Sequence, residues 1–155
     1  MPIRAVTIRL LAVALVAGVA LVASPAPAST PAEVKYANKI HERVNDIRAN
    51  QDRTRLKKDA CLLRFAVKRA EYLAQHQDTN LPHTDLGKVQ KACDVGWVGE
   101  NLVYGGGTPN QLVRMWMNSP PHKSNILHKK FRITGVAARK GGGVWWVAQV
   151  FGRKL

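Results

Sequence analysis

Two stretches decide the fold: Gly99-Glu100-Asn101-Leu102 and Pro121-His122-Lys123-Ser124-Asn125-Ile126-Leu127. Each places a polar residue, Glu100 or His122, in a segment that otherwise resembles protein core. Glu100 lies in an apolar run typical of a strand, where a carboxylate is costly to bury without a partner. His122 follows a double-proline break and opens a short helical segment. His83 lies upstream in a loop. We expect these three side chains to converge in one cleft.

The first 28 residues have the pattern of a secretory signal peptide. Two arginines precede an uncharged, largely apolar run over residues 10–23, and Ala26-Pro27-Ala28 supplies the small residues of a cleavage site. The alternative is an uncleaved membrane anchor, for which the run is short against the roughly 20 residues of a span. We therefore expect a secreted protein, cleavage near Ala28, a single domain over residues 29–155 and no transmembrane segment in that domain.

Cys61 and Cys93 are the two cysteines of the chain, and an oxidising compartment favours pairing them. The disulfide would close a loop of 33 residues, which by loop entropy contributes roughly 3–4 kcal/mol of stability. The alternative is two free buried thiols.

The charge balance is strongly basic, with 24 lysines and arginines against 10 acids. Removal of residues 1–28 leaves 22 basic residues and a net charge of +12. The basic residues are spread along the chain without the aromatic-interleaved cluster of a nucleic-acid site, so we expect no specific nucleic-acid recognition. Such a charge instead favours adhesion to acidic polymers, acidic lipids or extracellular DNA.

Local signals predict three main helices. Thr30-Pro31-Ala32-Glu33 and Thr108-Pro109-Asn110-Gln111 both have the pattern of a capping box with proline in the first turn, and Asp59 caps a helix that runs to about Gln77. The first helix carries an apolar stripe every three or four residues: Val34, Ala37, Ile40, Val44 and Ile47. Residues 49–58 and 78–96 are predicted to be irregular.

Residues 98–104, 131–138 and 144–151 are predicted to be strands, with residues 139–143 as a hairpin loop. The last strand is apolar on both faces, which indicates that the sheet is covered on both sides. We expect an α+β fold, an α-β-α sandwich with a small antiparallel sheet between helical layers. Gln149 lies in this apolar strand, so its amide should find partners in neighbouring backbone or loop groups.

Several pieces of the chain, in order over residues 33–155, resemble the CAP superfamily of cysteine-rich secretory, antigen five and pathogenesis-related proteins, and in particular its short bacterial SCP-domain members. The matching pieces are Val44-Asn45-Asp46-Ile47-Arg48, His83, Gly99-Glu100-Asn101-Leu102, residues 116–127, and residues 135–152. The resemblance implies the same α-β-α sandwich.

The resemblance also implies a central cleft in which family members hold two histidines and two glutamates that can bind a divalent metal. His83, Glu100 and His122 match three of these four positions. The fourth, a glutamate just after Trp116, is missing. Two imidazoles and a carboxylate can hold zinc with water as the fourth ligand, or Glu100 can simply pair with a histidine. Other polar or aromatic residues are predicted to support the site: Asn101, Trp116, Ser119, Asn125 and Gln149.

Three functions remain open at this stage. The first is a secreted, non-enzymatic binding module whose His/Glu cleft takes a small apolar or lipid-like ligand. The second is a metal-assisted hydrolase that uses the same cleft, although no nucleophile is evident, since Ser119 and Ser124 have the pattern of helix-end and turn residues. The third is a basic protein that adheres to extracellular polyanions. The balance favours a protein that is not an enzyme.

Overall fold

The computed structural model describes residues 28–155, so the predicted signal peptide over residues 1–28 falls almost wholly outside the described part of the chain. The elements follow in the order α1 (Pro31–Ala49), β1 (Lys57–Lys58), α2 (Ala60–His76), α3 (Leu86–Cys93), β2 (Val95–Gly105), α4 (Pro109–Met117), α5 (Pro120–Leu127), β3 (Ile133–Gly141) and β4 (Val144–Lys154).

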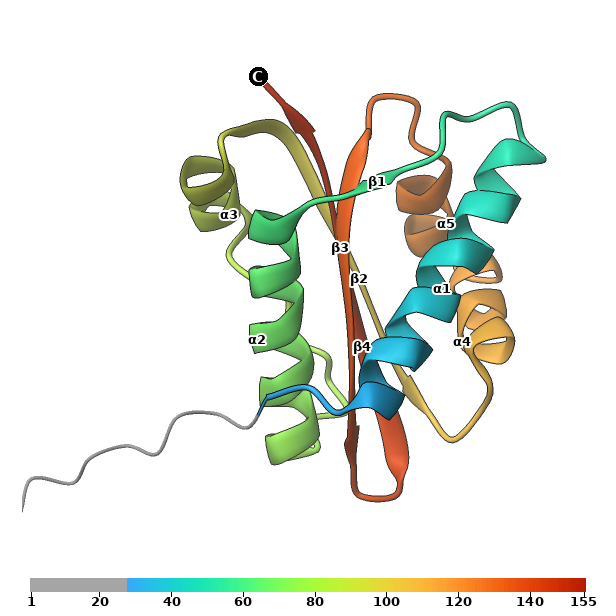
Figure 1. Ribbon diagram of the computed structural model, residues 1–155, viewed down its shortest axis with the longest axis vertical. Coiled ribbons are helices and arrows are strands. Elements are labelled where there is room, and N and C mark those ends of the chain that lie inside the picture. The colour runs from blue at the N-terminus through green and yellow to red at the C-terminus, as the bar shows by residue number, and fades with distance from the viewer. Residues whose placement is uncertain (1–27) are drawn as a thin grey trace, which may run out of the picture.

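The sheet lies between two helical layers, as Figure 1 shows, with α2 and α3 on one face and α1, α4 and α5 on the other. Alternate residues of each strand supply two separate cores. Val103 and Val147 belong to the core under α1 and α4, whereas Leu102 and Ala148 belong to the core under α2. The α-β-α sandwich predicted from the doubly apolar strand is thus confirmed.

The sheet is mixed, which corrects the prediction of a purely antiparallel one. Its strand order is β1-β3-β4-β2. The pairs β2–β4 and β3–β4 are antiparallel, while β1 runs parallel to β3 through Lys57 opposite Ile133 and Lys58 opposite Thr134. A pair of exposed lysines carries neither strand propensity nor an apolar alternation, so β1 was predicted as loop.

The helix starts agree with their capping signals. Thr30 and Thr108 both form complete capping boxes, and the Asp59 side chain accepts a hydrogen bond from the Leu62 N–H. The apolar stripe of α1 needs one correction, because Val34 is 48% exposed and Tyr36 is buried in its place. The Tyr36 ring stacks on Trp145 of β4, with ring centroids 4.0 Å apart.

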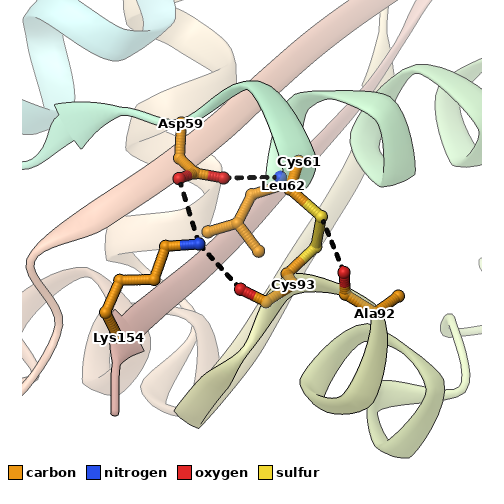
Figure 2. Close-up of a disulfide and its surroundings, with 6 residues drawn as sticks. All are labelled: Asp59, Cys61, Leu62, Ala92, Cys93 and Lys154. Atoms are coloured by element: carbon orange, nitrogen blue, oxygen red, sulfur yellow. Dashed lines mark hydrogen bonds and ion pairs between the residues drawn. A yellow bond between two sulfur atoms is a disulfide. The ribbon is translucent and has the colours of Figure 1, made fainter.

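The segment predicted to be irregular before β2 contains α3, which Asp85 caps at its start. Its eight residues give too few apolar repeats for a periodic signal. Figure 2 shows the disulfide that joins its last residue, Cys93, to Cys61 at the start of α2, with the Cα atoms 5.6 Å apart. The Lys154 ammonium reinforces the link, since it donates to the Cys93 carbonyl at 2.7 Å and lies 3.6 Å from the Asp59 carboxylate.

Arg48, at the end of α1, is fully buried, and four backbone carbonyls surround its guanidinium. It donates to the carbonyl oxygens of Thr54 at 2.8 Å, Ile126 at 2.6 Å, His128 at 3.2 Å and Phe131 at 3.2 Å. Burial, with smaller contributions from Arg132 and Arg53, lowers the pKa of Arg48 to about 10. The side chain therefore ties α1 to the connection between α5 and β3.

Replacing Arg48 by lysine should destabilise the fold by about 2–4 kcal/mol, because an ammonium cannot reproduce the planar set of donors and leaves buried carbonyls unpaired. Urea unfolding of Arg48→Lys measures the change. The exposed Arg43→Lys on the same helix is the control and should unfold at the wild-type midpoint. Equal midpoints for all three proteins would mean that the carbonyl cluster does not need the guanidinium.

Candidate functional site

Glu100 forms the centre of the predicted site. It lies in β2, one of the two edge strands, and is 3% exposed. Its Oε1 accepts a hydrogen bond from the Thr84 N–H at 2.8 Å and lies 2.9 Å from His83 Nδ1, while its Oε2 accepts from the Thr84 hydroxyl at 2.6 Å. The buried carboxylate thus has the partners that its burial requires.

This carboxylate holds the loop that follows α2 against the sheet. The Glu100 side chain is fully shielded, whereas the His83 side chain is 56% exposed, so the imidazole is anchored at Nδ1 and open elsewhere. The expected proximity of Glu100 and His83 is therefore present. Sequence reasoning missed Thr84, which supplies two of the three contacts. Its position directly after His83 was the available signal.

His122 approaches from the other helical layer. It lies in the first turn of α5, half-buried, with Nδ1 2.8 Å from the Ser119 hydroxyl. Burial, and second the charge of His83, lower its pKa below the ordinary value. The His122 carbonyl lies 3.0 Å from Nδ2 of Asn101, the residue after Glu100 on β2. No hydrogen bond within residues 28–155 uses Nε2 of either ring.

The predicted supporting residues connect β2 to the helices beside it. Asn101 Nδ2 donates to the His122 carbonyl at 3.0 Å, and Asn125 Nδ2 donates to both Asn101 Oδ1 at 2.9 Å and the Glu100 carbonyl at 3.1 Å. The Trp116 indole N–H donates to the Leu102 carbonyl at 2.9 Å. These bonds fix α5, and hence His122, relative to Glu100.

Gln149 lies on β4 directly opposite Asn101 and is fully buried. Its Nε2 donates to the Thr134 hydroxyl at 3.2 Å, and Thr134 in turn donates to the Val150 carbonyl. The partner that the sequence required is thus a strand side chain rather than a loop group. Within the described residues, Gln149 Oε1 has no hydrogen-bond partner.

A divalent metal at this site would be held by His83 and His122. Anchoring each imidazole at Nδ1, one by a carboxylate and one by a hydroxyl, leaves Nε2 available, as in metal sites with ordered outer partners. The Glu100 oxygens, however, already accept from Thr84 and face His83. In residues 28–155 no three His, Cys, Asp or Glu side chains lie close enough together to form a ligand cluster. Two protein ligands would hold such a cation only weakly, with water in the remaining positions.

Open hollows also occur in the helical layer formed by α1, α4 and α5, away from Glu100. Three adjoining hollows, of about 480, 250 and 490 Å³, share Met117 as a lining residue and follow the surface where α1, α4 and α5 meet. We call them the Met117 groove. Ile47, Val113 and Leu127 add apolar lining. Sequence reasoning missed the groove because three separate helices form it.

The chain belongs to the cysteine-rich secretory protein family, known as CAP, whose model matches residues 41–151. The helical layers on both faces of the sheet agree with the resemblance drawn from the sequence.

Three similar proteins come from bacteria. The chain is 29% identical to Bacillus subtilis protein YkwD over 123 residues, which cover 76% of this chain and 48% of that protein, so it spans about half of this relative's length. An outer surface protein of Borrelia burgdorferi matches with a TM-score of 0.69 at 20% identity, over 78% of this chain and 94% of that one. An extracellular SCP-domain protein of Bacillus anthracis matches with a TM-score of 0.67 at 20% identity, over 83% of this chain and 45% of that one.

None of the helices in residues 28–155 combines the length and apolarity needed to cross a membrane.

The electrostatic contact between the imidazoles is open to measurement. In His83→Gln the pKa of His122 should rise, because a neighbouring positive charge is removed, yet remain below its ordinary value, because the larger cause is burial. A depressed pKa also means that His122 lowers stability as the pH falls below about 6.5, since the unfolded chain then binds the proton more readily. NMR titration of the ring protons measures the shift. An unchanged His122 pKa in His83→Gln would show that the two rings do not face each other.

Proposed function

We propose that this CAP protein is an extracellular, non-enzymatic binding module that takes a small lipid-like ligand with an anionic end in the Met117 groove. The single observation that carries the proposal is an apolar floor beneath a basic rim. An extracellular location is supported by the predicted signal peptide, the disulfide and the descriptions of the Borrelia and Bacillus anthracis relatives as outer surface and extracellular proteins.

The floor of the groove suits a hydrocarbon chain. Ile47, Met117 and Leu127 are only partly buried against the core, so their outer surfaces face the hollow. Covering such surface contributes about 25 cal/mol per Å², or about 0.8 kcal/mol for each methylene of a ligand. Methionine adapts its shape to irregular apolar partners. The sequence alone placed the ligand in the His/Glu cleft, whereas in the structure these apolar side chains line the Met117 groove.

The rim of the groove suits an anion. Arg43 from α1, Arg114 from α4 and Lys123 from α5 line the hollows, together with the neutral Asn110 and Asn118. No aspartate or glutamate of residues 28–155 lines them. A carboxylate or phosphate head group would therefore meet guanidinium and ammonium donors, which form the stronger, charge-assisted kind of hydrogen bond.

The His/Glu site favours binding over catalysis. A general base must reach the proton that it abstracts, but the Glu100 carboxylate is shielded and engaged by Thr84 and His83. The Ser119 hydroxyl does lie beside His122, as a nucleophile lies beside its base. Yet no hydrogen bond within the described residues joins a carboxylate to His122 as an orienting partner, and its lowered pKa makes it a weaker base.

A divalent cation such as zinc at His83 and His122 is the second candidate ligand. The observation that favours it is the anchoring of both rings through Nδ1. Such binding would weaken as the pH falls, because protonated imidazole cannot ligate metal.

The test uses oleate as the probe, with binding measured by calorimetry on the secreted protein. Met117→Asp should weaken oleate binding at least about tenfold, because a carboxylate in the floor opposes both the chain and the head group. Met115→Asp on the same helix is the matched control, since Met115 is 51% exposed and does not line the groove. Arg114→Glu should weaken oleate more than oleyl alcohol, because only oleate carries the charge.

Three results would contradict the lipid proposal. One is oleate binding that Met117→Asp leaves unchanged. Another is binding that disappears in His122→Ala or with a chelator, which would move the ligand to the His/Glu cleft. The third is binding that falls steeply with salt and equally in all variants, which would indicate general attraction of anions to the basic surface.

A further inference from the structure

The two edges of the sheet are closed in different ways. Side chains cover the outer edge of β2: the amides of Gln90 and Asn125 and the indole of Trp116 donate to the carbonyls of Gly96, Glu100 and Leu102. An edge closed in this manner offers few free groups to another chain. The opposite edge, on β3, has no comparable cover along its middle within the described chain.

The outer edge of β3 is closed only at its ends. At one end β1 pairs with it, and the Asp59 N–H donates to the Thr134 carbonyl at 3.0 Å. At the other end the Lys140 N–H donates to Glu33 Oε1 at 3.0 Å. Backbone groups of every second residue point to the same edge, so the N–H and C=O groups of Val136 and Ala138 also point outward.

These outward groups lack partners within residues 28–155, where no hydrogen bond to them is formed outside the β3–β4 pairing. Ala138 is 1% exposed and Val136 is 9% exposed, so water has little access to either residue. Backbone polar groups that are both buried and unpaired are rare and costly. The edge therefore favours a partner that supplies backbone donors and acceptors.

The space beside this edge is an apolar groove of about 180 Å³ between α1 and α2. Val34 and Ala37 form the wall on α1, while Leu63 and Val67 form the wall on α2. Val34 and Leu63 are 48% and 42% exposed, which is high for large apolar side chains. Because α1 and α2 lie on opposite faces of the sheet (Figure 1), the walls stand above and below the next strand position.

This geometry admits one extended segment. β1 already occupies the same strand position at one end of β3. A second copy of the whole sheet could not approach closely, because α1 and α2 flank the edge. A lipid chain could cover the walls but would leave the Val136 and Ala138 backbone groups unpaired. A peptide strand meets both requirements, since its alternate side chains face α1 and α2 while its backbone pairs with β3.

The positive charge of Lys58 at the β1 end of the groove favours a peptide with an acidic residue at that end. Lys58 lines this end, and its ammonium donates to Asn38 Oδ1 at 2.8 Å. No ion pair in residues 28–155 engages Lys58, whereas the nearby Arg55 is already paired with Asp46. Glu33, the acid that lines the groove, lies at the far end and is occupied by Thr30, Lys140 and Arg139.

We propose that the edge of β3 between β1 and Lys140 binds an extended apolar peptide segment of another protein. The segment pairs with Val136 and Ala138 as an added strand, places small apolar side chains against both helices, and carries an acidic residue beside Lys58.

The test uses a synthetic heptapeptide of alternating valine and alanine with an aspartate at one end, added to the secreted protein. Amide hydrogen exchange by NMR should slow at Val136 and Ala138 by at least about tenfold at saturation. Ala137, which faces β4 and pairs with Ala148, should not change. A peptide with alternate backbone nitrogens methylated keeps the side chains but loses donors, so it should bind much more weakly. A peptide that ends in lysine should also bind more weakly.

Variants locate the site. Leu63→Glu should weaken peptide binding about tenfold, and Lys58→Glu about fivefold, since each removes one named feature of the groove. Tyr72→Glu, on the same helix and 41% exposed, and Lys39→Glu on α1 are the matched controls and should bind normally. The proposal is overturned if the methylated peptide binds equally well, or if Tyr72→Glu has the same effect as Leu63→Glu. It is also overturned if Val136 and Ala138 are already protected before peptide is added, because the edge would then be occupied.

Discussion

The buried carboxylate of Glu100 is the constraint on which the site depends. An acid in the middle of a strand needs several donors before it can be stable there, and Thr84 and His83 provide them. The same hydrogen bonds that stabilise the Glu100 carboxylate also hold the loop after α2 against the sheet. They leave the rest of the His83 imidazole exposed. Asn125 extends the network through the Glu100 carbonyl to α5 and therefore to His122.

The two edges of the sheet differ in how their backbone groups are hydrogen-bonded, and this difference determines which edge can accept another strand. On β2 the edge carbonyls are used internally, so this edge organises the His/Glu site and is closed to another strand. On β3 the short strand β1 and Glu33 close only the ends. The Met117 groove belongs to neither edge, since it arises where α1, α4 and α5 meet. One small sandwich thus separates the His/Glu site, the Met117 groove and the open edge of β3.

Much of the fold could be predicted from local signals. Capping boxes at Thr30 and Thr108, the apolar run of β2 and the doubly apolar β4 each act within a few residues. The approach of His83 to Glu100 followed from the cost of a buried acid. Features that depend on distant backbone were missed: Arg48 has no carboxylate partner to suggest its burial, and β1 is defined only by its pairing with β3. The Met117 groove was missed because it requires three helices to be placed before it exists.

Hydrogen exchange at the Thr84 amide in Glu100→Leu tests the role of Glu100 most directly. The Thr84 N–H has Glu100 Oε1 as its acceptor. Replacing the carboxylate by an apolar side chain of similar size should therefore raise the exchange rate of the Thr84 amide at least about tenfold. Val103 and Val147, paired across β2 and β4, should keep theirs because the apolar cores are unchanged. If Thr84 exchanged at the wild-type rate in Glu100→Leu, the carboxylate would not hold the loop that carries His83, and the account of the site would be wrong.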